Sequence, residues 1–141
     1  KMSISGNGGI FYKVVEGDQY PKPWHRGLEM QLLDDGGHEE GLIDTHRAGD
    51  LYDIRSAGAR LAKPTGQWNQ SRIVVKGKLI EQWMNGKKAL SVTIGSAKWK
   101  RIVVKSKYSE LSEFAKSKKG HIVLQDHGVK QRLRNLKIRE F

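Results

Sequence analysis

The chain has 141 residues, contains no cysteine and carries a formal net charge of +11 at pH 7. This length suffices for one domain with a hydrophobic core, and the lack of cysteine excludes disulfides, zinc–thiolate sites and thiol nucleophiles. The positive charge is confined to one half, because residues 1–70 hold 8 Lys+Arg against 10 Asp+Glu while residues 71–141 hold 18 against 5. We interpret most of these basic residues as a solvated sheet face rather than a nucleic-acid surface. No apolar run approaches the roughly 20 residues that span a bilayer.

Short alternating runs separated by turn residues dominate the chain and predict an antiparallel all-β domain. The predicted strands are residues 9–15, 28–33, 49–54, 69–76, 78–84, 87–93, 121–126 and 129–138. Asn85-Gly86 falls between two of these runs and predicts a hairpin with a type I′ turn, whose positive φ angles these two residues tolerate. A second tight reversal is predicted at Gly77.

Two segments depart from the strand pattern. Residues 109–117 are predicted as a short helix, because Leu111, Phe114 and Ala115 recur at helical spacing. Residues 34–47 are polar, contain glycine and follow neither period, which predicts a long loop. Loops of that length are usually functional or mobile.

The first residues bear on the extent of the chain. Residues 1–5 alternate like the end of a strand that is already under way. We therefore expect residues 1–141 to form a single β-sandwich domain that lacks its first strands and belongs to a longer protein. A targeting segment is then not expected within this sequence.

The second predicted strand carries the clearest functional signal. Leu28, Met30 and Leu32 share one face and are predicted to enter the core, because the side-chain period of a strand is two residues. Glu29 and Gln31 share the opposite face. A carboxylate beside an amide suits hydrogen bonding to sugar hydroxyls or acid–base chemistry, with an ordinary solvated face as the alternative.

The same parity argument adds residues from other strands. If Met84 packs inward, Glu81 and Trp83 face outward, and we predict that they share the exposed surface of Glu29. The Trp83 indole would then offer a flat platform for a sugar ring, with a half-buried strand aromatic as the alternative. Tyr52 is placed on this surface as well.

The strand and turn at residues 121–128 supply two further candidates. Ile122 and Leu124 fit the core, which leaves Gln125 and His127 pointing outward near the strand end. Asp126 beside His127 either holds the imidazole as a general base or forms a turn that hydrogen-bonds its own backbone. The predicted concave polar wall consists of Glu29, Gln31, Tyr52, Glu81, Trp83, Gln125 and His127.

Metal and phosphate sites are weakly supported. Asp34, Asp35 and His38 could donate to a metal, but their spacing matches no standard ligand pattern, so no metal ligands are predicted. The glycine-rich residues 6–9 precede a strand rather than a helix, which makes them a poor phosphate cradle.

Several segments, taken together and in order, are distinctive. They are residues 7–12 (Asn-Gly-Gly-Ile-Phe-Tyr), 27–34 (Gly-Leu-Glu-Met-Gln-Leu-Leu-Asp), 48–53 (Ala-Gly-Asp-Leu-Tyr-Asp), 63–64 (Lys-Pro), 66–69 (Gly-Gln-Trp-Asn), 80–86 (Ile-Glu-Gln-Trp-Met-Asn-Gly), 120–128 (Gly-His-Ile-Val-Leu-Gln-Asp-His-Gly) and 134–139 (Arg-Asn-Leu-Lys-Ile-Arg). In this order they resemble the bacterial 3-keto-disaccharide hydrolase family over nearly the whole chain. The chain departs from the family pattern at Leu133, where the family tends to place an aromatic residue before Arg-Asn.

The resemblance implies a concanavalin A-like jelly-roll sandwich of two antiparallel sheets, a periplasmic or secreted location, and a sugar substrate already oxidised to a ketone at carbon 3. The ketone acidifies the hydrogen at carbon 2, so that a base can remove it and the group at carbon 1 leaves by elimination, followed by addition of water. Glu29 or His127 would be the base. Gln31, Gln125 or Tyr52 would donate to the enolate oxygen, and Glu81 and Trp83 would help to bind the sugar. No cofactor is predicted, although a divalent metal in place of these donors is left open.

Two other functions are alternatives to this enzyme. A non-catalytic carbohydrate-binding module could use the same fold, since fold alone does not decide function. A basic nucleic-acid binder should interleave aromatics with Lys and Arg, and only Trp99 between Lys98 and Lys100 fits that pattern. Trp24, Trp68 and Trp99 are otherwise predicted to be packing residues at strand ends.

Overall fold

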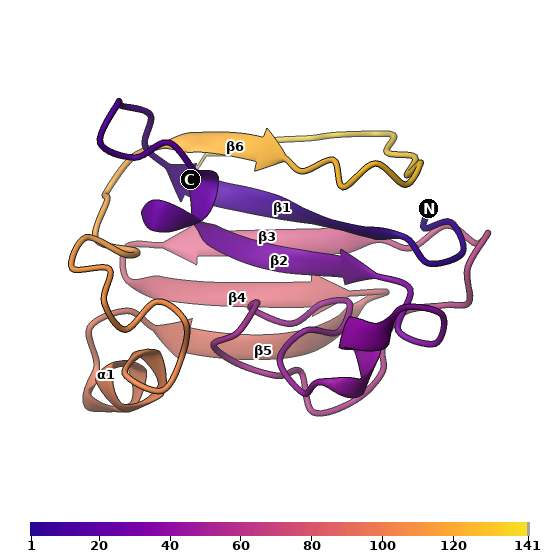
Figure 1. Ribbon diagram of the computed structural model, residues 1–141, viewed down its shortest axis with the longest axis horizontal. Coiled ribbons are helices and arrows are strands. Elements are labelled where there is room, and N and C mark those ends of the chain that lie inside the picture. Colours follow the sequence, from indigo (N-terminus) through magenta and orange to yellow (C-terminus); the bar gives the residue numbers. More distant parts are fainter. Residues whose placement is uncertain (141) are drawn as a thin grey trace.

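The computed structural model describes residues 1–140 and arranges six strands in two antiparallel sheets. The strands are β1 (Asn7–Val14), β2 (Leu28–Leu33), β3 (Ser71–Lys76), β4 (Leu79–Met84), β5 (Lys87–Thr93) and β6 (His121–Leu124). One sheet has the order β2-β1-β6 and the other the order β3-β4-β5. The sheets face each other as two layers of a β-sandwich, which confirms the all-β prediction (Figure 1).

Both predicted tight turns are present in the β3–β4–β5 meander. Asn85 and Gly86 have φ angles of 50° and 79° and join β4 to β5, as a type I′ turn requires. Gly77 has a φ angle of 58° and reverses the chain between β3 and β4. The connections within this sheet are therefore ones that local turn chemistry specifies.

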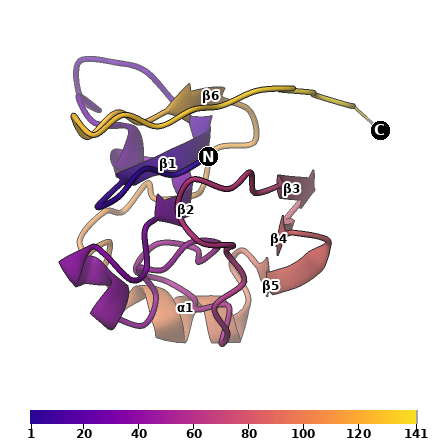
Figure 2. The same ribbon diagram turned by 90° about the vertical axis from the view of Figure 1, so that its right-hand side faces the viewer.

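The core lies between β1 and β2 on one side and β4 and β5 on the other. The β1–β2 register pairs Ile10 with Met30 and Tyr12 with Leu28 on the inner face. The buried side chains that meet them from the second sheet are Ile80, Met84, Leu90 and Val92. Figure 2 shows the two layers edge on, with the chain after β6 running on in an extended form.

A buried hydrogen bond joins the two sheets inside this core. Gln82 Nε2 donates to Tyr12 Oη at 3.1 Å, and Gln82 and Tyr12 are 0% and 4% exposed. Burial raises the pKa of the Tyr12 hydroxyl, which keeps it protonated. Because alternate residues point to opposite faces, Gln82 in the core places Glu81 and Trp83 on the outer face of the β3–β5 sheet.

Two predicted strands are wrong. Residues 49–54 form turns, because Gly49 and Asp53 adopt positive φ angles of 93° and 56°. Leu51 makes only isolated bridges, although backbone hydrogen bonds still hold this segment beside β2. Residues 129–138 form no strand, since within residues 1–140 they join no strand ladder and make only isolated backbone bonds such as that from Arg132 to the Lys1 carbonyl.

The predicted helix at residues 109–117 is also wrong, and the α-helix of the described residues lies at a position where none is predicted. That segment forms turns, and its apolar spacing instead places Phe114 on Tyr108, with ring centroids 4.1 Å apart. The helix is α1 (Ala97–Val103), capped by Ser96 Oγ, which accepts from the Trp99 amide at 3.1 Å. Two short 3₁₀ helices, η1 (Pro23–His25) and η2 (Glu39–Leu42), complete the elements.

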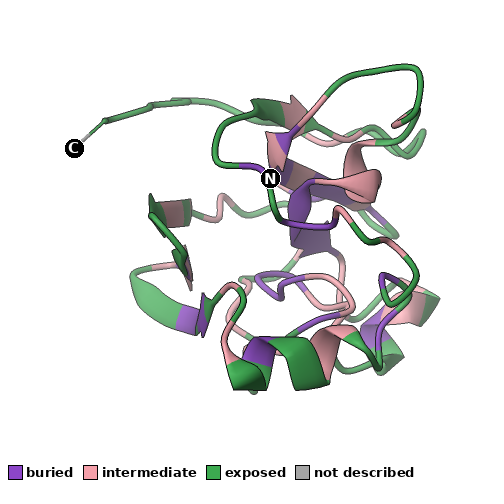
Figure 3. Ribbon diagram, turned by 90° about the vertical axis from the view of Figure 1, so that its left-hand side faces the viewer, coloured by how far each residue is buried: buried purple, intermediate pink, exposed green. Residues whose placement is uncertain are grey.

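The expectation that Ile122 and Leu124 enter the core is wrong as well. They are 55% and 43% exposed, because β6 is an edge strand and no strand of the second sheet lies opposite it in the described residues. Figure 3 shows this contrast, with buried residues along β1 and β2 and exposed ones along β6 and the chain after it.

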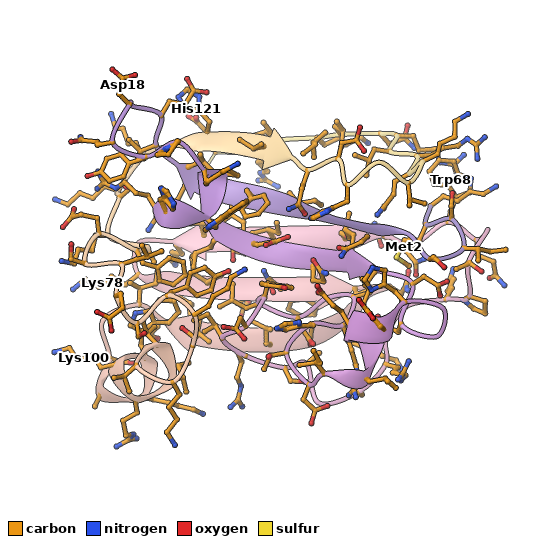
Figure 4. All side chains as sticks on the ribbon, in the orientation of Figure 1. Met2, Asp18, Trp68, Lys78, Lys100 and His121 are labelled. Carbon is orange, nitrogen blue, oxygen red and sulfur yellow. The ribbon has the colours of Figure 1, made fainter. Side chains whose placement is uncertain are left out.

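The surface carries the excess basic charge. Lys78 and Lys100, for example, lie at the periphery of the molecule and are exposed (Figure 4). No helix among residues 1–140 has the length and apolar character needed to cross a membrane.

The inter-sheet hydrogen bond can be tested by removing one partner. We expect Tyr12→Phe to lower the free energy of unfolding by about 1–3 kcal/mol, because the buried Gln82 amide loses its acceptor. Tyr20→Phe is the matched control, since Tyr20 is only partly buried. Urea unfolding measures both variants, and equal stabilities would show that the bond contributes nothing.

Candidate active site

A small cavity of about 150 Å³ opens on the outer face of β2. It is lined by Asn7, Trp24, Glu29, Gln31, Glu40, Tyr52, Lys107, Gln125 and His127. The structure therefore brings together five of the seven side chains predicted for the polar wall. Ligand pockets typically enclose roughly 300–1,000 Å³, so this cavity suits one small ring rather than a large ligand.

Glu29 is the buried charge at the centre of this pocket. Its residue is only 5% exposed, and no basic side chain of residues 1–140 lies within 4.0 Å of its carboxylate. Burial raises the pKa of Glu29 to about 7; the positive charge of Lys107 opposes this rise and the carboxylate of Glu40 adds to it. Near neutral pH, Glu29 is thus divided between its acid and base forms.

A glycine on the neighbouring strand makes room for this side chain. A Cβ atom at Gly9 would lie 2.1 Å from Glu29 Oε1 and 2.8 Å from its Cγ. Gln31 pairs with Gly9 across the strands. With the Gln31 amide turned so that its NH₂ group faces these acceptors, it donates to Glu29 Oε1 at 3.2 Å and to the Gly8 carbonyl at 3.0 Å; in the opposite orientation Nε2 donates to Asn7 Oδ1 at 3.1 Å. The glycine-rich segment therefore accommodates a carboxylate rather than a phosphate.

A ring of polar contacts holds the outer wall of the pocket. Tyr52 Oη donates to Glu40 Oε2 at 3.2 Å, and the His46 ring stacks on Tyr52 with centroids 4.2 Å apart. His46 Nε2 lies 3.2 Å from Asp53 Oδ1, which fixes the ring on its other side. Burial, reinforced by the Glu40 carboxylate, raises the pKa of Tyr52, so this hydroxyl remains a donor.

The rim opposite this wall comes from the chain after β6. His127 is exposed there, and Gln125 is partly buried with no hydrogen-bond partner for Oε1 in residues 1–140. Asp126 Oδ1 accepts from the Gly128 amide at 2.7 Å, so the Asp-His-Gly sequence forms a turn that bonds its own backbone. Asp126 therefore does not orient His127.

Glu81 and Trp83 do not join the pocket, so the prediction that they share its surface is wrong. They lie on the outer face of the other sheet, where Lys88 Nζ donates to Glu81 Oε1 at 2.6 Å. Trp83 Nε1 donates to Glu81 Oε2 at 3.2 Å, and Arg72 and Lys88 lie over the indole. These bonds lower the pKa of Glu81, the bond from Lys88 most of all.

The three side chains considered as metal donors accept hydrogen bonds from backbone amides. Asp34 Oδ2 accepts from the Ser5 amide, Asp35 Oδ1 from the Ala48 amide, and His38 Nδ1 from the Glu40 amide. Among residues 1–140 no group of three His, Cys, Asp or Glu side chains is arranged to hold a metal ion.

Four pocket residues were missed by sequence reasoning: Asn7, Trp24, Glu40 and Lys107. Only Glu40 had a usable signal, because it lies in the long loop that was expected to be functional or mobile. Trp24 was expected to be a packing residue at a strand end, but it lies in η1 and lines the pocket. Lys107 comes from a turn after α1, and no local pattern marks it.

The fold and the pocket define a β-sandwich protein with a polar cavity built around the buried carboxylate of Glu29. Residues 1–139 match the model of the 3-keto-alpha-glucoside-1,2-lyase-like domain, and the chain belongs to this family. This agrees with the resemblance found in the sequence.

Named relatives point the same way. The chain is 28% identical over 160 residues to a 3-keto-disaccharide hydrolase of Bacteroides thetaiotaomicron, covering 99% of this chain and 55% of that protein. A solved structure from Parabacteroides distasonis, of a protein assigned to the glycosyl hydrolases, is 33% identical with a TM-score of 0.85; the match covers 92% of this chain and 63% of that one. A second structure from that species, likewise assigned, shares the fold at 23% identity and a TM-score of 0.57, over 66% of this chain and 47% of that one. The chain thus spans somewhat more than half the length of the first two proteins.

The raised pKa of Glu29 predicts a pH-dependent stability cost. The pKa is about 7 in the folded state against an ordinary 4.5, so stability falls as pH rises from about 4.5 to about 7. Glutamine does not ionise, so the Glu29→Gln variant lacks this pH-dependent loss. We expect its free energy of unfolding, relative to that of the wild type, to rise by about 3 kcal/mol between pH 4.5 and pH 8. Urea unfolding at both pH values measures this difference, and a constant difference would contradict the assignment.

The space that Gly9 leaves for the Glu29 side chain can be tested by adding one methyl group at this position. Gly9→Ala should displace the Glu29 side chain and lower the free energy of unfolding by about 1–3 kcal/mol. Because the carboxyl then has new surroundings, its pKa should no longer be about 7. Gly17→Ala is the matched control, because its nearest neighbouring atom would be 3.8 Å away. Unfolding experiments and carboxyl NMR titration read out the two effects, and equal behaviour of both variants would refute this role of Gly9.

Proposed function

We propose that this pocket cleaves the glycosidic bond of 3-keto-glycosides and that Glu29 is the base that starts the reaction. Family membership and the names of the relatives support this class of substrate. The observation that carries the proposal is the buried carboxylate of Glu29, which makes no ion pair with the other charged side chains of the pocket, Glu40 and Lys107. A general base works best when its pKa lies near the working pH, and that of Glu29 is about 7.

The chemistry begins at the carbon next to the ketone. Glu29 removes the proton from carbon 2, and the electron pair of that bond forms the enolate of the carbon 3 ketone. As the ketone re-forms, a double bond appears between carbons 1 and 2, the bond from carbon 1 to the leaving oxygen breaks, and that oxygen takes a proton. Water then adds to carbon 1 and a proton returns to carbon 2, which gives net hydrolysis.

The surrounding residues have distinct tasks in this scheme. Gln31 orients the Glu29 carboxylate through its amide NH₂. His127 is exposed at the rim, and we assign it to the leaving oxygen, because the small cavity leaves that part of a glycoside near solvent. Gln125 and Tyr52 are assigned to sugar hydroxyls, and the Trp24 indole to the apolar face of the ring.

A direct assay compares a 3-keto-glucoside with its unoxidised parent sugar. We expect release of the reducing product from the keto sugar alone, with kcat/KM rising through a pH near 7 as Glu29 loses its proton. Glu29→Gln should lower kcat by about 10²–10⁴-fold. Glu81→Gln is the matched control, because it removes the same charge from the opposite face of the sandwich and should leave turnover unchanged.

Other results would redirect the proposal. Equal turnover by the wild type and Glu29→Gln would remove Glu29 as the base. Binding of sugar without product release would indicate a carbohydrate-binding module on the same fold. Activity that disappears with a chelator and returns with a divalent cation would add a metal to the mechanism.

A further inference from the structure

Lys107 is the one lysine or arginine among residues 1–140 that lines the pocket. Lys107 lies in the turn that follows α1, and its backbone amide donates to Asp53 Oδ2 at 2.6 Å. The neighbouring residues Ser106 and Tyr108 are buried, which fixes this turn against the core. The backbone of Lys107 is therefore anchored to the same Asp53 that holds His46.

The ammonium group of Lys107 sits among three aromatic rings. Nζ lies 4.1 Å from the centroid of Tyr52, 5.2 Å from that of Tyr108 and 5.7 Å from that of Trp24. The three rings come from different parts of the chain, so the tertiary structure assembles this frame around one cation. Contacts at such distances are attractive and orient the cation without using its N–H donors.

The N–H donors of Lys107 are left free. No described residue accepts a hydrogen bond from Nζ, and no carboxylate lies within 4.0 Å of it. Other lysines are used differently: Lys88 donates to Glu81 at 2.6 Å. Lys107 is exposed at the pocket rim; the burial of part of its side chain lowers the pKa of the ammonium, and the carboxylates of Glu29, Asp53 and Glu40 oppose that change.

Resting on the function proposed above, we propose that Lys107 is the group that recognises the substrate ketone and stabilises the enolate oxygen formed from it. Glu29 and Lys107 line the same cavity with opposite charges and no direct ion pair. A carbonyl oxygen held by the ammonium would leave the adjacent C–H to the carboxylate. A hydroxyl at the same position could not take up the negative charge, so Lys107 would select the oxidised sugar.

In this proposal, formation of the enolate involves Glu29 as the base, Lys107 beside the oxygen, and no further reagent. When Glu29 takes the proton from carbon 2, the C–H electron pair forms a second bond between carbons 2 and 3, and the π pair of the carbonyl bond moves onto the oxygen, which takes the charge. The ammonium keeps its proton and stabilises that oxygen electrostatically. The stabilisation ends when the carbonyl re-forms and the group on carbon 1 departs.

The enolate step can be isolated with a keto sugar that has no leaving group. We would incubate the chain with 3-keto-1,5-anhydroglucitol in D₂O and follow exchange of the hydrogen at carbon 2 by NMR. Lys107→Met should lower the exchange rate by about 10²–10³-fold, as loss of one preorganised oxyanion donor does. Lys107→Arg should retain part of the rate, because it keeps the charge.

Lys105→Met is the matched control, since Lys105 is exposed in the same turn and does not line the pocket. Its exchange rate and melting temperature should equal those of the wild type. If Lys107→Met fails to fold, Lys107→Gln replaces it.

The outcomes separate this inference from the proposed function. Exchange by the wild type that persists within threefold in Lys107→Met would overturn the role of Lys107 and leave the function standing. A wild type that neither exchanges the keto sugar nor cleaves a 3-keto-glucoside would overturn the function itself. Trapping of a covalent sugar adduct on Lys107 by cyanoborohydride would replace the ionic role with an imine.

Discussion

The pairing of β1 with β2 is the constraint on which both the core and the pocket depend. It places Tyr12 opposite Leu28 on the inner face and Gly9 opposite Gln31 on the outer face. A slip of one residue would exchange these faces and expose the apolar set. The same register puts a glycine where the Glu29 side chain needs space, so that one pairing pattern satisfies packing and chemistry together.

The electrostatics of the pocket follow from how few cations it contains. Among the described residues, Lys107 is the only lysine or arginine that lines it, against carboxylates at Glu29 and Glu40. Because Lys107 makes no ion pair with Glu29, burial dominates the pKa of that carboxyl instead of being cancelled. A direct salt bridge would lower this pKa and leave Glu29 fully ionised at neutral pH. The aromatic frame lets the two charges share a cavity without neutralising each other.

The side chains around Glu29 are supplied largely by irregular segments. Glu40 comes from η2, Tyr52 from the turns after it, and Lys107 from the turn after α1. Each is fixed by hydrogen bonds or ring stacking rather than by a strand ladder, as the Asp53 contacts to His46 and Lys107 illustrate. This division is common in proteins, where a rigid sheet carries one reactive group and loops supply its surroundings.

By itself, the sequence determined features that depend on neighbours in the chain. Alternation fixed β2 and the outward face of Glu29 and Gln31, and Asn85-Gly86 determined a hairpin, because side-chain period and turn dihedrals are local properties. Alternation could not assign Glu81 and Trp83 to a sheet, since parity relates residues within one strand and not between layers. The helical spacing of apolar residues around Phe114 likewise did not reflect a helix, because Phe114 packs on Tyr108 in the folded protein. Only the tertiary structure brought Lys107 to the pocket, because its position depends on contacts between segments far apart in the chain.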